Sequence, residues 1–200
     1  MNAVPSQFSS FLDGSFNALG HWYNIPMENP PSLILVSGPI AVGKSTVSKL
    51  LANSLDNAVY IEGDQYLNAH DHFHDISWET KLERSWTAVI SAAKRFLDQG
   101  AHVIIDFVVE HEFPWICQQL LSRGPRVFHI VLFTDPQTIA QRLRQRDGHV
   151  QQMERSLVLL QQLKENANDQ QVFIETTNKA PPEIVAEILK IVSTSSSLSN

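Results

Sequence analysis

The chain has 200 residues, of which 43% are apolar and 18% charged, which suits one α/β domain with a sizeable core. A formal net charge of −6 without a long basic run argues against nucleic acid as the main partner. Cys117 is the single cysteine, no apolar run is long enough to span a bilayer, and residues 1–20 lack the features of a signal peptide, so we expect a cytoplasmic protein without a membrane partner.

Residues 1–31 precede the first predicted strand and are interpreted as an N-terminal extension. Phe8, Phe11 and Phe16 fall on one helical stripe, so we expect a short amphipathic helix that packs on the domain or on a partner. This stripe also makes self-association through the extension a hypothesis. The folded domain is expected over 32–192, and the serine-rich segment 193–200 is expected to be a flexible tail.

The stretch from 38 to 46 follows the apolar strand pattern 33–37 and precedes a helical pattern over 46–55. It fits G-x-x-x-x-G-K-[ST], in the strand, loop and helix context that gives this motif its meaning. Its glycines allow the loop amides to form an anion-binding concavity at the positive end of the helix. We therefore predict a nucleoside triphosphate site made by Gly38, Pro39, Ile40, Ala41, Val42, Gly43, Lys44, Ser45 and Thr46.

Within this loop, two side chains have separate expected roles. Lys44 is expected to reach the terminal phosphates as a point charge, and the Ser45 hydroxyl is expected to ligate Mg²⁺. The motif thus predicts a triphosphate bound together with Mg²⁺, but it does not say what happens to the γ-phosphate.

Downstream of the P-loop helix, apolar strand patterns alternate with helical ones. The predicted strands are 58–61, 102–105, 127–133 and 172–175, and the predicted helices are 78–99, 115–122, 136 to about 148, 151–166 and 182–192. Five strands alternating with helices predict a three-layer α/β fold, with a parallel sheet covered on both faces and ligands at the carboxyl ends of its strands. The P-loop, Asp64 and Asp106 each fall at such an end, so we expect them to converge on one crevice.

This layout resembles the small P-loop kinases, a group that includes shikimate kinase, gluconate kinase, chloramphenicol phosphotransferase, the zeta toxins and adenylate kinase. The resemblance rests on the P-loop, on Asp64 after the second strand, on Asp106 ending the third, and on the R-x-x-x-R helix that carries Arg142 and Arg146. It implies a five-stranded sheet of order 2-3-1-4-5, a mobile lid, and phosphoryl transfer from ATP to a hydroxyl or a phosphate.

Four residues are predicted to handle the acceptor. Asp64 is the candidate base, because a carboxylate facing the γ-phosphate can accept or orient the proton of an acceptor hydroxyl. Asp106 is expected to hold Mg²⁺ through water or to bind the acceptor. Tyr66 and Glu110 are further candidates for acceptor contacts. The alternative for both aspartates is a helix cap or a loop position.

Two other clusters are singled out by spacing. Arg142 and Arg146 lie four apart, hence on one helix face, and are expected to neutralise the transferred phosphoryl group or to stack on adenine. The alternative is a solvated helix face. His70, His72 and His74 alternate as three imidazoles can when they bind zinc, although the resemblance places the mobile acceptor-binding segment here.

The function predicted from the sequence is an ATP-dependent phosphotransferase that moves the γ-phosphate to a hydroxyl of a small molecule. Two alternatives stay open: a nucleotide or polynucleotide 5′-kinase, and a nucleotide-binding regulatory domain with little turnover. The acidic balance weakens the polynucleotide version.

Overall fold

A five-stranded parallel sheet forms the centre of the molecule, in the order β2-β3-β1-β4-β5. The computed structural model describes residues 30–70, 75–120, 124–145, 151–165, 167 and 170–194. The strands are β1 Ser32–Ser37, β2 Ala58–Glu62, β3 His102–Asp106, β4 Arg126–Phe133 and β5 Gln171–Glu175. The predicted fold class and strand order are confirmed.

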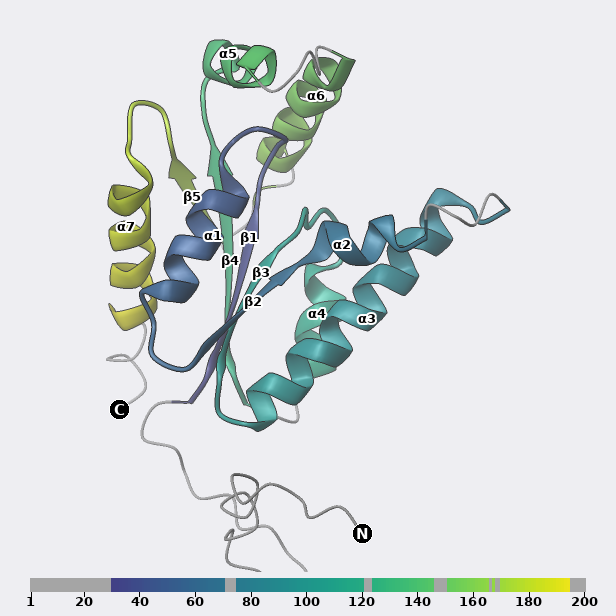
Figure 1. The fold of residues 1–200 in the computed structure, drawn as a ribbon, viewed down its shortest axis with the longest axis vertical. Helices are drawn as coiled ribbons and strands as arrows, with labels where there is room; N and C mark the ends of the chain where they lie inside the picture. The colour runs from purple at the N-terminus through teal and green to yellow at the C-terminus, as the bar shows by residue number, and fades with distance from the viewer. Residues whose placement is uncertain are drawn as a thin grey trace, which may run out of the picture.

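Helices cover both faces of this sheet and its carboxyl edge (Figure 1). One face packs on α1 (Lys44–Asn53) and α7 (Pro181–Thr194), and the other on α3 (Trp78–Asp98) and α4 (Phe113–Leu120). The remaining helices, which lie toward the carboxyl ends of the strands, are α2 Gly63–Asn68, α5 Pro136–Gln145 and α6 Gln151–Glu165.

The central strand β1 explains why the molecule has three layers. All six of its residues are buried, and successive side chains of a strand point to opposite faces. Leu33 and Leu35 join the core under α3 and α4, whereas Ile34 and Val36 join the core under α1 and α7. The uninterrupted apolar run Leu33–Val36 is therefore typical of a strand that is buried on both faces of a sheet, and the polar groups lie at the strand ends.

The structure differs from the sequence interpretation in two local details. The segment after β2 forms the short helix α2, so Asp64 lies in a first helical turn and not in a loop; six residues are too few for a periodicity argument. Helix α4 starts at Phe113, two residues before the predicted start. The reason is Glu112, whose carbonyl accepts the first helical bond from Ile116 N while its carboxylate accepts the amides of Glu110 and His111.

Several predicted features lie outside the described residues. They are the helical stripe of the N-terminal extension, the segment 71–74, Arg146, and the tail beyond Thr194. Self-association through the extension and the domain limits therefore stay predictions. Among the helices that the structure describes, none is both long and apolar enough to cross a membrane.

His129 on β4 makes the fold sensitive to acid. Its side chain is 1% exposed, its ring stacks on Phe113 with centroids 4.9 Å apart, and neither ring nitrogen has a hydrogen-bond partner among the described residues. Burial lowers the pKa of His129 to about 4, against about 6.5 in the unfolded chain. The folded protein thus holds a neutral imidazole that the unfolded chain protonates as the pH falls below about 6.5.

We therefore expect the unfolding free energy to fall by about 2 kcal/mol between pH 7.5 and pH 5 because of this one group. The measurement is urea denaturation of the wild type and of His129→Leu at both pH values. The variant should lose less stability on acidification by that amount, and equal losses in the two proteins would rule His129 out as the cause.

Candidate active site

The P-loop joins β1 to α1 through three positive φ angles. They are 136° at Gly38, 65° at Ala41 and 108° at Gly43, and Gly43 is the N-cap of α1. A Cβ atom at Gly38 would lie 2.3 Å from the carbonyl oxygen of Leu132, so the loop approaches β4 more closely than any side chain allows. A loop of this shape at a helix N-terminus is a general anion site.

Lys44 folds back over this loop. Its ammonium donates to the carbonyl oxygen of Gly38 at 3.0 Å and to that of Pro39 at 3.2 Å. Lys44 and Ser45 are half-buried and Thr46 is exposed. The positive charge therefore lies against the backbone of the P-loop.

Three elements brace the loop from outside. Arg142 of α5 donates to the carbonyl of Val42 at 2.8 Å, and the Thr176 hydroxyl after β5 donates to the same oxygen at 3.4 Å. The Ser156 hydroxyl of α6 donates to the carbonyl of Ile40 at 2.9 Å. Arg142 thus contacts the P-loop backbone; its expected action on the transferred phosphoryl group stays a prediction.

Acidic groups meet at the ends of β2 and β3, as the sequence interpretation expected for Asp106. Glu62 and Asp106 are partners in the strand register, and Asp106 is 5% exposed. The Tyr60 hydroxyl donates to Asp106 Oδ2 at 3.1 Å and also interacts with the Ser45 hydroxyl. Tyr60 thereby links the P-loop to the end of β3.

The pKa of the Tyr60 phenol is raised well above its usual value. Burial is the main cause, the carboxylates of Asp106 and Glu62 add to it, and the interaction with Ser45 opposes it. The phenol consequently stays protonated at any physiological pH and remains a donor to Asp106.

The oxygen donors at this point suit Mg²⁺. The Ser45 hydroxyl and the Asp106 carboxylate are hard oxygen ligands held together through one phenol, and Mg²⁺ prefers few protein oxygens together with substrate phosphates. Among the described residues, no group of three or more His, Cys, Asp or Glu side chains could hold a metal ion. His70 is described but residues 71–74 are not, so the structure does not test the alternative of zinc at the histidine cluster.

Asp64 faces the same region from α2. Partial burial raises the pKa of its carboxyl, the Lys44 ammonium opposes this rise, and Asp106 and Glu62 add to it. The residue as a whole is still exposed, so Asp64 is accessible from solvent. Its neighbour Gly63 admits no side chain, because a Cβ there would lie 2.2 Å from the Phe107 ring.

Tyr60 and Arg155 are parts of this site that the sequence interpretation missed. Arg155 of α6 interacts electrostatically with Asp64, and its guanidinium lies 5.3 Å from the Trp78 ring centroid. Tyr60 lies in a strand that was predicted correctly. Its hydroxyl, two residues before the end of that strand, was the feature of the sequence that could have marked it as a site residue. Arg155 lay in a helix predicted only as polar, and nothing in its pattern marks which face meets the P-loop.

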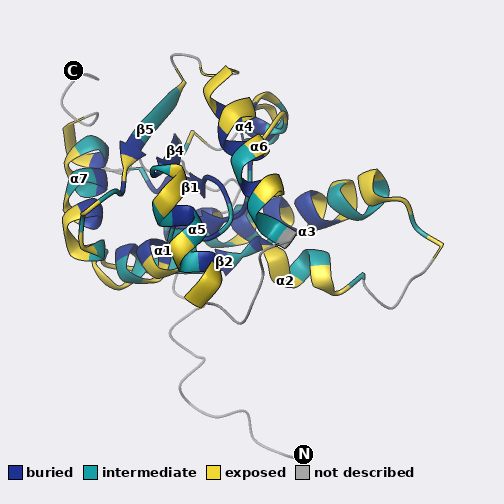
Figure 2. Ribbon diagram, turned by 90° about the horizontal axis from the view of Figure 1, so that it is seen from above, coloured by how far each residue is buried: buried dark blue, intermediate teal, exposed yellow. Residues whose placement is uncertain are grey.

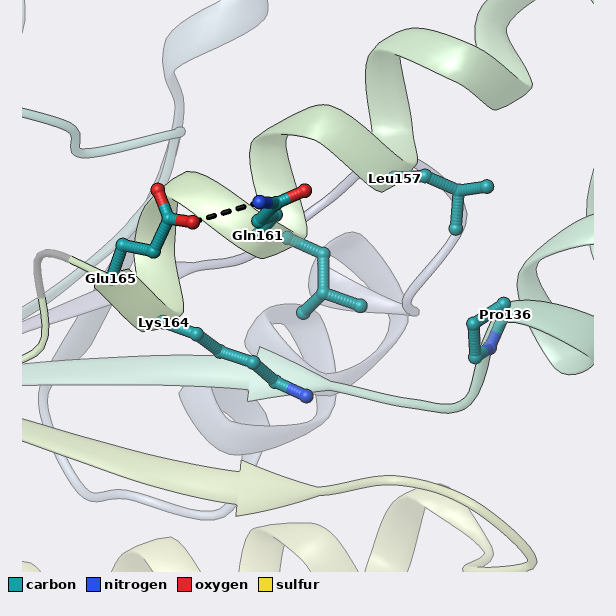
Figure 3. A pocket seen from close by; sticks show the side chains of 6 residues that line it. Pro136, Leu157, Gln161, Lys164 and Glu165 are labelled. Atoms are coloured by element: carbon teal, nitrogen blue, oxygen red, sulfur yellow. Dashed lines mark hydrogen bonds between the residues drawn. The ribbon is translucent and has the colours of Figure 1, made fainter.

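Two cavities flank the P-loop side of the molecule. One of about 290 Å³ is lined by Gly43, Thr46, Arg142 and Lys179, among others, and lies between the P-loop and the segment after β5. The other, of about 440 Å³, lies between α6 and the first residue of α5 and is lined by Pro136, Leu157, Leu160, Gln161, Lys164 and Glu165 (Figure 3). None of Lys44, Asp64 and Asp106 lines the second cavity, so we give that cavity no catalytic role.

Tyr66 and Glu110 are the other two residues predicted to contact the acceptor. Tyr66 is half-buried and packs against the core under α3 and α4. Glu110 lines a third cavity, of about 500 Å³, together with residues of α3 and α4. The view along the sheet from above shows α5 lying across the strand ends, with α2 and α3 to one side of it and α7 to the other (Figure 2).

Comparison with known proteins shows the family to which the chain belongs. The model of the family described as "AAA domain" matches residues 33–168. A Pyrococcus furiosus protein named "Putative adenylate kinase" is 31% identical over 172 residues, which cover 80% of this chain and 83% of that protein.

Two solved structures share the fold. The tunicamycin resistance protein of Deinococcus radiodurans superposes with a TM-score of 0.64 at 20% identity, covering 81% of this chain and 95% of the other. A gluconokinase from Sinorhizobium meliloti 1021 superposes with a TM-score of 0.59 at 18% identity, covering 84% and 95%. The chain therefore belongs to the AAA domain family and, by its fold and relatives, to the small P-loop kinases.

Proposed function

We propose that the protein transfers the γ-phosphoryl group of ATP to a hydroxyl of a small molecule. The observation that supports this most is the convergence of Lys44, Asp64 and Asp106 at one edge of the sheet, with the Tyr60 phenol joining Ser45 to Asp106. A kinase needs a phosphate cradle, a metal site and a carboxylate facing the acceptor, and these residues offer all three.

The proposed step uses the residues as follows. The P-loop amides and Lys44 hold the phosphates. Ser45 and Asp106 would hold Mg²⁺, which would neutralise negative charge on the phosphates. The acceptor oxygen bonds to the γ-phosphorus as the bond to the β-phosphate oxygen breaks, and ADP leaves. The acceptor proton goes to Asp64, and Arg155 balances the charge of that carboxylate. Arg142 and Arg146 are the proposed lid cations.

The 290 Å³ cavity beside the P-loop is the proposed place for the base and ribose of ATP. The cavity runs from Gly43 and Thr46 to Lys179 and Pro181, which follow β5. Arg142 also lines it, so its guanidinium is available to stack on adenine as well as to brace the loop. We assign this cavity to the donor nucleotide.

A nucleotide kinase is the second candidate. The Pyrococcus furiosus relative carries the name "Putative adenylate kinase", which favours a nucleoside monophosphate as acceptor. That acceptor needs cations for its phosphate, and this requirement separates the two candidates.

The test is ATP binding followed by acceptor-dependent ADP release in a screen of sugars, sugar acids, amino alcohols, nucleosides and AMP. Lys44→Ala should weaken ATP binding at least about tenfold, because one charge-assisted contact to phosphate is lost. Lys190→Ala, on the exposed side of α7, is the matched control. ATP bound equally well by all three proteins would remove the P-loop from the proposed function.

A further inference from the structure

The third cavity, of about 500 Å³, lies between α3 and the segment that leads from β3 into α4. Trp78, Leu82 and Trp86 follow one another at intervals of four on α3 and form one wall, and Trp115 of α4 contributes to another. The indole N–H of Trp86 is buried and has no acceptor among the described residues. Volume and aromatic lining are typical of a small-molecule site.

The cavity is strongly acidic. Glu79 and Glu83 come from α3, and Glu110 and Glu112 from the segment before α4. Glu79, Glu83 and Glu110 are exposed, whereas Glu112 already accepts two backbone amides. Within the part of the chain that the structure describes, no lysine or arginine lines this cavity. The side chains that line it therefore carry a net negative charge, and three of them are indoles, whose faces attract cations, as the Arg155 guanidinium over Trp78 illustrates.

Two chains of contacts connect this cavity to the proposed phosphoryl-transfer site. The Trp86 ring lies 4.7 Å from the Phe107 ring, centroid to centroid. Phe107 in turn occupies the space next to Gly63, the residue before Asp64. A second link runs through Arg155, which interacts with Asp64 and lies over Trp78. An acceptor in the cavity would thus have one end close to the candidate base.

We propose that this cavity binds the acceptor and that the acceptor is a hydroxyl compound carrying an ammonium group. The proposal rests on the proposed phosphotransferase function and deepens it. A phosphate or carboxylate on the acceptor would face four glutamates, and like charges at close range are strongly unfavourable. The guanidinium of Arg155, which lies over Trp78, is shared with Asp64. An ammonium group gains from both the carboxylates and the indole faces.

The experiment uses the full chain with ATP and five acceptor probes. Glucosamine, choline and kanamycin carry both hydroxyl and ammonium groups, whereas gluconate and AMP are anionic. Intrinsic tryptophan fluorescence reports binding, because three tryptophans line the cavity, and ADP release reports transfer. We expect saturable binding and transfer with at least one ammonium probe, and neither with gluconate or AMP.

Charge-neutral variants test the assignment to this cavity. Glu79→Gln combined with Glu83→Gln should weaken the best ammonium probe about tenfold or more while ATP binding stays unchanged. Glu175→Gln, at the end of the opposite edge strand β5, is the matched control and should change nothing.

Saturable binding or transfer with AMP or gluconate in preference to every ammonium probe would overturn the proposal, and so would the absence of a response to all three ammonium probes. Neither result touches the phosphotransferase proposal, which fails separately if ATP binding does not depend on Lys44.

Discussion

Asp64→Asn is expected to lower kcat for phosphoryl transfer by about 10²–10⁴-fold, the usual range for the loss of a positioned acid–base group. Asparagine keeps the size of the side chain but cannot accept the acceptor proton. ATP binding should be retained, because the phosphates are held by the P-loop amides and Lys44. Nucleotide titration and single-turnover transfer, measured on the same preparations, separate the two steps.

The pH dependence gives a second readout for Asp64. Burial raises the pKa of its carboxyl, and only the ionised form can take a proton. The transfer rate should therefore fall on acidification at a higher pH than an ordinary aspartate would produce. This limb of the profile should be absent in Asp64→Asn.

Asp56→Asn is the matched control, since Asp56 is an exposed residue that precedes β2 at the opposite end of the sheet. It should leave both binding and transfer unchanged. Full transfer activity in Asp64→Asn would remove this residue from the mechanism.

Gly38→Ala is expected to reduce the unfolding free energy by about 4 kcal/mol and to abolish ATP binding. A Cβ at this position lies 2.3 Å from the Leu132 carbonyl oxygen, and the φ of 136° is one that only glycine adopts without strain. Leu132 lies on β4, which pairs with β1 on one side and β5 on the other, so its oxygen cannot move away alone. The loop must shift instead, and the phosphate cradle with it.

Gly124→Ala provides the comparison, because Gly124 has a positive φ of 65° but no atom within 4 Å of the added Cβ. It should cost only about 1–2 kcal/mol of backbone strain and leave ATP binding intact. Urea denaturation and nucleotide titration measure both variants. Equal stability losses would show that the close approach of the P-loop to β4 is not what requires glycine at position 38.

Much of the architecture could be read from local patterns. Continuous apolar runs such as Leu33–Val36 indicated buried parallel strands, and the spacing of Gly38, Gly43 and Lys44 indicated a phosphate loop. Both patterns depend on near neighbours in the chain, and the structure confirmed the parallel sheet that they implied, as well as the strand order that the family resemblance implied.

Contacts between distant segments were beyond such reasoning. The bond from Arg142 to Val42 spans 100 residues, and the bond from Ser156 to Ile40 spans 116. Whether Arg142 faces the loop backbone or the phosphates depends on where α5 docks, and a helical repeat shows which residues share a face but not what that face meets.

The proposed acceptor site shows the same division. Glu110 could be proposed from its place after β3, yet the tryptophan walls and the three other glutamates come from α3 and from the start of α4. These glutamates lie together only because the segment that connects β3 to α4 packs against α3. Local patterns in the chain were enough to specify a buried parallel sheet and a triphosphate loop. The packing of helices over the strand ends decided which charges face each other, since electrostatic interactions depend on distance in space and not on separation along the chain.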